Sequence, residues 1–305
     1  MGGSLMSMLA VSTALAASLS TGSSTSVEPP QLENQEYQQD AQSASKSDDT
    51  VEQILKQIAS KENTPDSEVT GVSRVMRVLD SPGSVSSSSI SSTNPLGIDI
   101  SGHQHNSSGS IDINTAVDQS NIEFAFIKAT ESTNYINPNF REDTMTSINK
   151  GIPIGFYHYA KPKNSISDAK AQARFFVDVT GINKGVKTLP PILDLEENKE
   201  GLTTEQLIAW TQAYVDEVKA LTGKNVMMYT YPSFWRNEMG NTTRFSELPL
   251  WIAHYHDGNK PDVPGGWTNW TFWQYTSKGR VNGYNQDIDM NFFNGSSEAL
   301  KSIYS

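Results

Sequence analysis

The stretch LPPILDLEEN, residues 189–198, combines two prolines, a short apolar run and two acids spaced two residues apart. The prolines favour an extended entry, and the apolar residues after them are typical of a strand that is buried on both faces. Side chains alternate along a strand, so Asp194 and Glu196 lie on one face and Leu195 lies on the other. The stretch therefore predicts a buried strand whose carboxyl end presents two neighbouring carboxylates.

Seven similar runs continue this pattern through the C-terminal two-thirds of the chain, and helix-like segments separate the early ones. Helical periodicity is clearest at 168–181 and 203–223, and the second segment has Thr203 or Thr204 as N-cap and stops at Gly223. With 190–196, the runs are LGIDIS (96–101), FAFIKAT (124–130), IPIGFYHYA (152–160), NVMMYTY (225–231), PLWIAHY (249–255), FWQYT (272–276) and DIDMNFF (287–293).

Eight strands, with helices between the first five and little room for helices among the last three, predict an α/β fold. We expect a closed, parallel-type, TIM-like barrel with a degenerate end, in which the chemistry lies at the carboxyl ends of the strands. An open doubly wound sheet is the alternative. The first βα turn has no glycine-rich phosphate loop, which disfavours a nucleotide-binding version of that sheet.

The N-terminal third has a different composition. The run LMSMLAVSTALAAS ends in a small-x-small pattern at Ala14-Leu15-Ala16, so residues 1–17 are predicted to be a signal peptide, although no Lys or Arg precedes the run. Residues 18–94 are rich in Ser and Thr and predict a disordered linker. Two islands within it, 51–62 and 69–79, have helix-compatible periodicity. The remaining residues, 95–305, form the predicted catalytic barrel domain.

Charge and cysteine content exclude several classes of function. The net charge of −11 is divided into −6 for residues 1–94 and −5 for the remainder, and neither part has the basic patch that nucleic-acid binding requires. The chain has no cysteine, so disulfides, thiolate metal sites and a cysteine nucleophile are excluded. All six Trp residues follow position 209, which places the material for a core in the C-terminal part.

Acids recur at the ends of three predicted strands. Asp99 ends the first run, Asp194 and Glu196 end the fourth, and Asp287 and Asp289 lie in the eighth. In a closed barrel, strands one and eight are neighbours and strand four lies across the mouth. We therefore expect the acids to converge on one polar cup. Residues of other strands would surround it, namely Tyr157, Tyr159, Tyr229, Tyr231, Trp251, Trp273 and Gln274.

Carboxylates that crowd together raise at least one pKa, so one group keeps its proton near neutral pH beside an ionised partner. Such a pair is what glycoside hydrolysis requires, because one group protonates the leaving oxygen and the other stabilises the oxocarbenium-like centre. The alternative is structural: single acids at strand ends cap helices or pair with Lys and Arg, and single aromatic residues belong to the core.

The motifs in this order resemble those of the family 25 glycoside hydrolases, which are muramidases (lysozymes) of bacteria and phages. The resemblance covers about residues 96–298, through GIDIS, FAFIKATEST, GIPIGFYHYA, LPPILDLE, MMYTYPSFW, LPLWIAHY, WTFWQYTSKGRVNG and DIDMNFFNGS. It implies a modified barrel of five βα units plus three further strands. It also implies cleavage of the β-1,4 bond between N-acetylmuramic acid and N-acetylglucosamine without a metal or cofactor.

By the same resemblance, Glu196 is the general acid. Asp194 is its partner, acting as nucleophile or orienting a substrate acetamido group that attacks instead. Asp99 and Asp289 are flanking acids, and the implied substrate contacts are Tyr157, Tyr229, Trp273 and Gln274. Two stretches depart from the family pattern: the loop GHQHNSSGSIDI (102–113) is longer, and GYNQD before Ile288 replaces a small turn, which makes Asp287 an extra acid.

Two rival functions are alternatives to this interpretation. The HQH motif at 103–105, with His158, His254 and His256, is reminiscent of metal-dependent amidohydrolase barrels, but the acids at the end of the fourth strand form an oxygen-rich cup that suits zinc poorly. A non-catalytic wall-binding module is the second rival. The favoured hypothesis is a secreted or cell-wall-associated monomer that acts on bacterial peptidoglycan. It has no membrane span in its mature form and is most simply an autolysin of a Gram-positive organism.

Overall fold

The computed structural model describes residues 52–53, 56, 90–91 and 93–305. The predicted signal peptide, almost all of the predicted linker and the island at 69–79 lie outside these residues. Of the island at 51–62, only Glu52, Gln53 and Lys56 are described, and all three are helical. None of the described helices has the length and apolar character that a membrane span needs.

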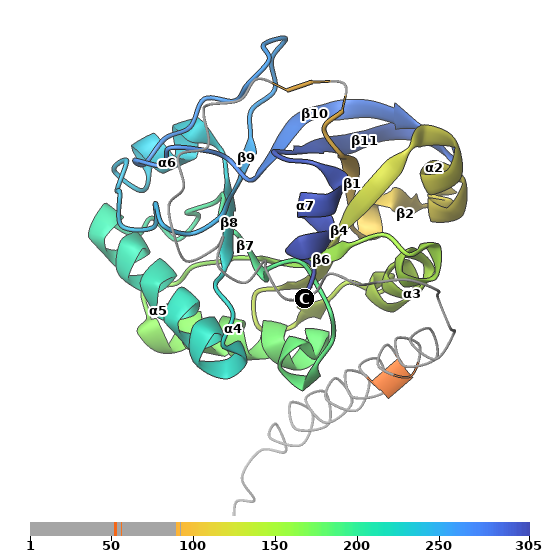
Figure 1. Cartoon of the computed structure of the whole chain (residues 1–305). Coiled ribbons are helices and arrows are strands. Elements are labelled where there is room, and N and C mark those ends of the chain that lie inside the picture. Colours follow the sequence, from red (N-terminus) through yellow and green to blue (C-terminus); the bar gives the residue numbers. More distant parts are fainter. Residues whose placement is uncertain (1–51, 54–55, 57–89, 92) are drawn as a thin grey trace, which may run out of the picture. The chain divides into compact units, whose positions relative to one another are not determined.

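Eight strands form a closed barrel in the order β1-β11-β10-β9-β8-β7-β6-β4, and β4 pairs with β1 to complete the ring (Figure 1). Strand β11 is antiparallel to both of its neighbours, whereas the other pairings around the ring are parallel. The strands are β1 (Leu96–Ile100), β4 (Ile122–Glu131), β6 (Ile154–Tyr159), β7 (Ile192–Asp194), β8 (Met227–Thr230), β9 (Leu250–Ala253), β10 (Phe272–Val281) and β11 (Tyr284–Phe293).

Each of the first five barrel strands is followed by a helix, as predicted, and the last three follow one another without one. Figure 1 shows these helices on the outside of the strand ring. They are α2 (Ile113–Ser120), α3 (Phe140–Lys150), α4 (Ile166–Thr180), α5 (Thr204–Thr222) and α6 (Pro232–Asn237). The expected barrel of five βα units plus three strands is confirmed, and its structural neighbours, reported below, have the same fold.

Helix α5 begins and ends where the sequence predicts. The Thr203 hydroxyl accepts from the Gln206 backbone N–H, and the Gln206 side chain accepts from the Thr203 N–H at 2.9 Å, which completes a capping box. Gly223 ends the helix in the left-handed region, with φ 70°.

The barrel interior is filled by large aromatic residues of β4 that lie beside glycines of the neighbouring strands. Phe124 is in register with Gly97 of β1, and Phe126 with Gly155 of β6. A Cβ atom at Gly155 would lie 2.6 Å from the Phe126 ring, and one at Gly97 would lie 2.4 Å from the Phe124 ring. The rings therefore occupy the space that side chains at these two positions would need.

The C-terminal helix α7 (Ser297–Ser302) closes the barrel end opposite to the strand-end acids. Its Leu300 is buried in the same cluster as Phe124 and Phe293, and the last residue, Ser305, exchanges two backbone hydrogen bonds with Thr188. In Figure 1, α7 lies inside the ring of strands. Access to the interior is consequently left at the carboxyl ends of the parallel strands.

Several short elements lie at the open end of the barrel. A 3-10 turn, Gly102–Gln104, and a hairpin of β2 (His105–Asn106) and β3 (Gly109–Ser110) form the long loop after β1. Strand β5 (Tyr135–Ile136) pairs with the end of β4. A second 3-10 turn, Ile182–Lys184, connects α4 to the start of β7 and so belongs to the opposite end of the barrel.

Candidate active site

Four carboxyl groups from three strands converge at the open end of the barrel. Asp99 of β1 is directly opposite Asp289 of β11 in the sheet register, Asp194 ends β7, and Glu196 follows two residues later. The Tyr157 hydroxyl lies among them: its pKa is raised well above the ordinary value by burial and by the charges of all four acids. The predicted convergence of these acids is thus present in the structure.

Asp99 is held by two amide donors. It is only 6% exposed, and its Oδ2 accepts from Gln274 Nε2 at 2.9 Å and from Asn291 Nδ2 at 2.8 Å. The Asn291 Oδ1 in turn accepts from Trp251 Nε1 at 2.8 Å. Burial raises the pKa of Asp99 to about 6, and the two hydrogen bonds oppose this shift without cancelling it.

Two tyrosines fix the orientation of the Gln274 amide. Its Oε1 accepts from the hydroxyls of Tyr229 at 3.0 Å and Tyr255 at 2.6 Å, which leaves Nε2 to donate to Asp99. Tyr229 is buried, whereas Tyr255 is 52% exposed and forms part of the rim. Asp99 is therefore the inner end of a chain of hydrogen bonds that leads to the surface.

The other three acids are less satisfied than Asp99. Asp194 is 5% exposed, and its Oδ1 has no hydrogen-bond partner among the described residues. Burial, and then the Glu196 charge, raise its pKa well above the ordinary value. Glu196 is half-buried, and its pKa is raised by burial and then by Asp99. Burial and the charges of Asp99 and Glu196 raise the pKa of Asp289 to about 8.

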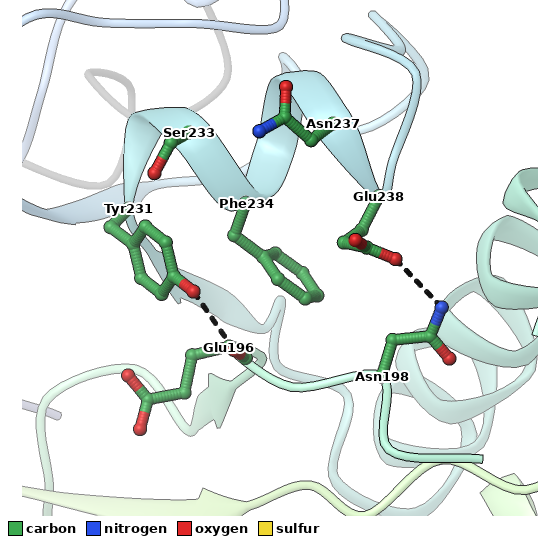
Figure 2. Close-up of a pocket in the computed structure, with 7 residues that line it drawn as sticks. All are labelled: Glu196, Asn198, Tyr231, Ser233, Phe234, Asn237 and Glu238. Atoms are coloured by element: carbon green, nitrogen blue, oxygen red, sulfur yellow. Dashed lines mark hydrogen bonds between the residues drawn. The ribbon is translucent and has the colours of Figure 1, made fainter. Parts of the chain in front are cut away.

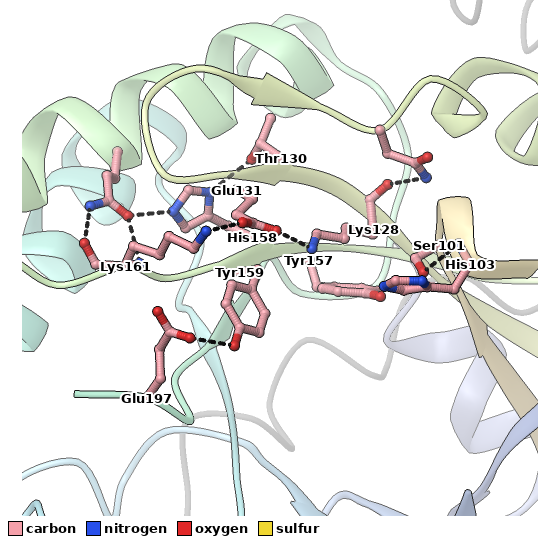
Figure 3. A network of polar contacts seen from close by, with 12 residues as sticks. Ser101, His103, Lys128, Thr130, Glu131, Tyr157, His158, Tyr159, Lys161 and Glu197 are labelled. Atoms are coloured by element: carbon pink, nitrogen blue, oxygen red, sulfur yellow. Dashed lines mark hydrogen bonds and ion pairs between the residues drawn. The ribbon is translucent and has the colours of Figure 1, made fainter. Parts of the chain in front are cut away.

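One buried cation faces this group of acids, and it is not among the site residues that the sequence predicts. Lys128 of β4 is 9% exposed, its Nζ pairs with Glu131 Oε2 at 2.5 Å, and it lies 4.6 Å from the centre of the Tyr159 ring (Figure 3). Its charge lowers the pKa values of Asp194 and Glu196 and so opposes the effect of burial. Its position inside the apolar run FAFIKAT could have indicated a buried ion pair near the site, because a buried lysine requires an acidic partner.

Three of the predicted substrate contacts lie in the cup, and Trp273 does not. Tyr157, Tyr229 and Gln274 face the barrel interior beside the carboxyls. Trp273 precedes Gln274 and thus points to the other face of β10, where its indole N–H donates to the His254 carbonyl at 2.8 Å and its ring packs against other aromatics of the outer core. The structure does not support Trp273 as a substrate contact.

Asp287, the extra acid of the eighth strand, is not a member of the group. Its side chain is exposed and forms an ion pair with Arg280 across the β10–β11 hairpin, at 2.7 Å. The outer half of this hairpin extends beyond the barrel, and residue 287 lies in that half. Asp289 is the acid of β11 that faces Asp99, as the family motif implies.

The five histidines do not converge on one site. His105 pairs with Asp143 at 2.9 Å, His158 is fully buried, and His254 and His256 pack against each other with ring centres 4.2 Å apart. His103 is exposed. Over the described residues, no cluster of three or more His, Cys, Asp or Glu side chains is arranged to hold a metal ion.

Glu196 also lines a second hollow, which we call the α6 pocket. Its volume is about 210 Å³, and it lies between α6 and the segment that follows β7 (Figure 2). Its lining residues are Glu196, Asn198, Tyr231, Ser233, Phe234, Asn237 and Glu238.

Comparison with known proteins agrees with this geometry. The profile "Glycosyl hydrolases family 25" matches residues 98–284. The chain is 38% identical over 214 residues to "Lysozyme M1" of Streptomyces globisporus, covering 68% of this chain and 70% of that protein. It is 35% identical over 191 residues to the "N,O-diacetylmuramidase" of a Chalaropsis species, covering 59% of this chain and 87% of that protein.

A solved structure extends the match to three dimensions. The bacterial lysozyme from Streptomyces coelicolor superimposes with a TM-score of 0.62 at 37% identity, covering 70% of this chain and 98% of that one. The chain belongs to family 25 of the glycosyl hydrolases and is a glycoside hydrolase.

Proposed function

We propose that this protein is a secreted muramidase that hydrolyses the β-1,4 bond between N-acetylmuramic acid and N-acetylglucosamine in bacterial peptidoglycan. The observation that carries the proposal is the convergence of Asp99, Asp194, Glu196 and Asp289 on one buried cup. The names of the similar proteins, a lysozyme and a muramidase, support the same substrate.

In this proposal Glu196 is the general acid. It is half-buried, and its raised pKa keeps the proton that the leaving glycosidic oxygen needs. Asp99 and Asp289 face each other beside the proposed donor sugar, and the negative charge of Asp99, whose pKa is about 6, stabilises the positive charge that develops on the sugar ring in the transition state. After bond cleavage, Glu196 as a carboxylate accepts a proton from the incoming water.

Asp194 has two possible roles, and both use its unpartnered Oδ1. As a nucleophile, it would form a covalent glycosyl ester with the anomeric carbon. As an orienting group, it would accept a hydrogen bond from the N–H of the substrate acetamido group, whose carbonyl oxygen then attacks the anomeric carbon and forms an oxazoline. Trapping with a thiazoline analogue, which mimics the oxazoline, separates the two roles.

The test of the proposed function is the release of dye from labelled cell walls together with the identity of the new reducing ends. Wild-type protein should release dye and create reducing N-acetylmuramic acid, which becomes N-acetylmuramitol after borohydride reduction. Glu196→Gln should lose at least about 10³-fold in rate, because the acid proton is gone. Glu200→Gln, an exposed acid four residues away, is the control and should keep the wild-type rate.

Reducing N-acetylglucosamine in place of N-acetylmuramic acid would refute the bond assignment. A Glu196→Gln variant that lyses walls as fast as the parent would refute the catalytic assignment. The proposed secretion through residues 1–17 and the monomeric state are checked separately, by N-terminal sequencing of protein from the culture medium and by light scattering.

A further inference from the structure

The α6 pocket extends the active site in one direction, away from the cup. The Tyr231 hydroxyl donates to the Glu196 carbonyl at 3.4 Å at one end, and Asn198 Nδ2 donates to Glu238 Oε2 at 2.9 Å at the other. Figure 2 shows Phe234 between these two contacts, with its ring turned toward the segment 196–198. The pocket therefore has an aromatic wall along its length and polar groups at both ends.

The hydrogen bonds of the Asn198 side chain are all made within the protein, so Glu238 is the residue of the pocket with an oxygen available to accept a hydrogen bond from a ligand. The Asn198 amide donates to the Leu202 carbonyl at 2.9 Å as well as to Glu238, and its Oδ1 accepts from the Leu202 N–H at 2.8 Å. All of its hydrogen-bonding groups are thus used within the protein. Glu238 Oε1 has no such partner in the described part of the chain.

The charge of Glu238 is unusual for its position. It is the C-cap of α6, where the unpaired carbonyls of the last turn favour a cation rather than a carboxylate. The neighbouring cation, Arg236, makes two hydrogen bonds to Asp262 and does not compensate it. In the described part of the chain neither Glu238 nor Glu196 forms an ion pair with Lys or Arg. A carboxylate that local stability disfavours, at the wall of a cavity beside the catalytic acid, indicates a role in binding.

The position of the pocket determines which sugar it contacts. The α6 pocket is lined by Glu196 but not by Asp99, Asp194 or Asp289, among which the proposed function places the donor sugar. A general acid lies between the donor sugar and the leaving group, because it protonates the oxygen that joins them. The pocket is therefore on the leaving-group side, which the proposed reaction assigns to a 2-amino-2-deoxyglucose residue.

We propose that Glu238 determines specificity for the nitrogen substituent of the leaving-group sugar and favours a free ammonium over an acetamide. This inference rests on the proposed function. An acetamide offers one N–H donor to Glu238, whereas an ammonium offers three donors and a positive charge to this carboxylate, which no Lys or Arg of the described residues neutralises. The protein should accordingly cleave glycan whose glucosamine is N-deacetylated more efficiently than the fully acetylated form.

The experiment compares peptidoglycan before and after enzymatic N-deacetylation of its glucosamine, with a portion re-acetylated by acetic anhydride as the substrate control. The measured quantity is the ratio of kcat/KM on deacetylated glycan to kcat/KM on acetylated glycan. Glu238→Gln keeps the shape and an acceptor for Asn198 but removes the charge, and we expect the ratio to fall about five- to tenfold, mainly through KM. Glu247→Gln, an exposed acid elsewhere with the same change in net charge, should leave the ratio unchanged.

A second measurement keeps the inference testable if Glu238→Gln folds poorly. The wild-type ratio should decrease as salt rises from 0.05 to about 0.5 M, because an ion pair in a solvent-open pocket is screened. A ratio that salt does not change, or that Glu238→Gln leaves within about twofold of wild type, would overturn the inference while cleavage of acetylated glycan still supported the muramidase function. Failure of the wild type to cleave either glycan would refute the proposed function itself.

Discussion

At the scale of single residues, the site is a balance between burial, which raises carboxyl pKa values, and a few groups that lower them. Asp99 has two amide donors. Asp194 Oδ1 has no hydrogen-bond partner among the described residues, and the nearby charge of Lys128 lowers the raised pKa of Asp194. The acids of one buried group thus differ in pKa, with Asp99 at about 6 and Asp289 at about 8, so that they need not all be ionised at the same pH.

Lys128 provides a test of this balance. Lys128→Met should raise the pKa values of Asp194 and Glu196, because a cation near a carboxylate lowers its pKa. Both limbs of the pH profile of kcat/KM should then move to higher pH. Lys128→Arg keeps the charge and should leave the profile near that of wild type. A Met variant with an unshifted profile would show that Lys128 acts only through packing.

At the scale of elements, the apolar runs predicted all eight barrel strands, because strands covered on both faces are continuous in sequence. Strands β10 and β11 extend further than predicted, to Val281 and from Tyr284, since their outer halves pair mainly with each other and carry polar side chains. The short hairpin β2–β3 is also polar, so the sequence has no hydrophobic pattern that would predict it. Helix α3 was not located because most of its residues are polar, including Asp143, Thr144 and Ser147, which are buried.

The glycine–phenylalanine pairs of the barrel interior predict that a larger residue at either glycine destabilises the fold. Gly155→Ala should reduce the free energy of unfolding by about 1–3 kcal/mol, because its Cβ would overlap the Phe126 ring. Adding Phe126→Leu makes room, so the double variant should be more stable than the sum of the two single changes predicts. Urea denaturation of the four proteins measures this coupling, and strictly additive changes would contradict it.

The capping box of α5 gives a second prediction at this scale. Thr203→Ala removes the hydroxyl that accepts from the Gln206 N–H and should cost about 1 kcal/mol of unfolding free energy. Thr203→Ser keeps that acceptor and should be close to wild type. Equal stability of the Ala and Ser variants in urea would show that the cap does not stabilise the helix.

At the scale of the whole molecule, closing the barrel is what brings the acids together. The strand pattern located five acids, and alternation predicted the shared face of Asp194 and Glu196. The family resemblance, and not the spacing, selected Asp289 over Asp287. Alternation alone did not show which of Trp273 and Gln274 points into the barrel. Both side chains are buried, so the apolar pattern of β10 does not indicate which of its faces lies inside. The α6 pocket was also missed, since Asn198 and Glu238 are 40 residues apart and meet only through the fold.

The raised pKa values also predict how stability depends on pH. Asp289 has a pKa of 3.8 as its ordinary value and about 8 in the fold, so the folded state binds more protons than the unfolded state between these values. Its contribution to stability is complete below about pH 4 and is lost as pH rises through about 8. Asp289→Asn should therefore raise the melting temperature at pH 8 by at least about 2 °C and have little effect at pH 4. A variant that is less stable than wild type at pH 8 would contradict this sign.

The most direct test of the central claim is a carboxyl-detected NMR titration of protein labelled with ¹³C at its Asp and Glu side chains, in wild type and in Asp99→Asn. If the acids share one low-dielectric cavity, Asp99 should titrate near pH 6 and Asp289 near pH 8. Asp99→Asn should then lower the pKa of Asp289. If both acids titrate below pH 5, or if Asp289 does not respond to the loss of the Asp99 charge, these carboxyl groups do not form one site.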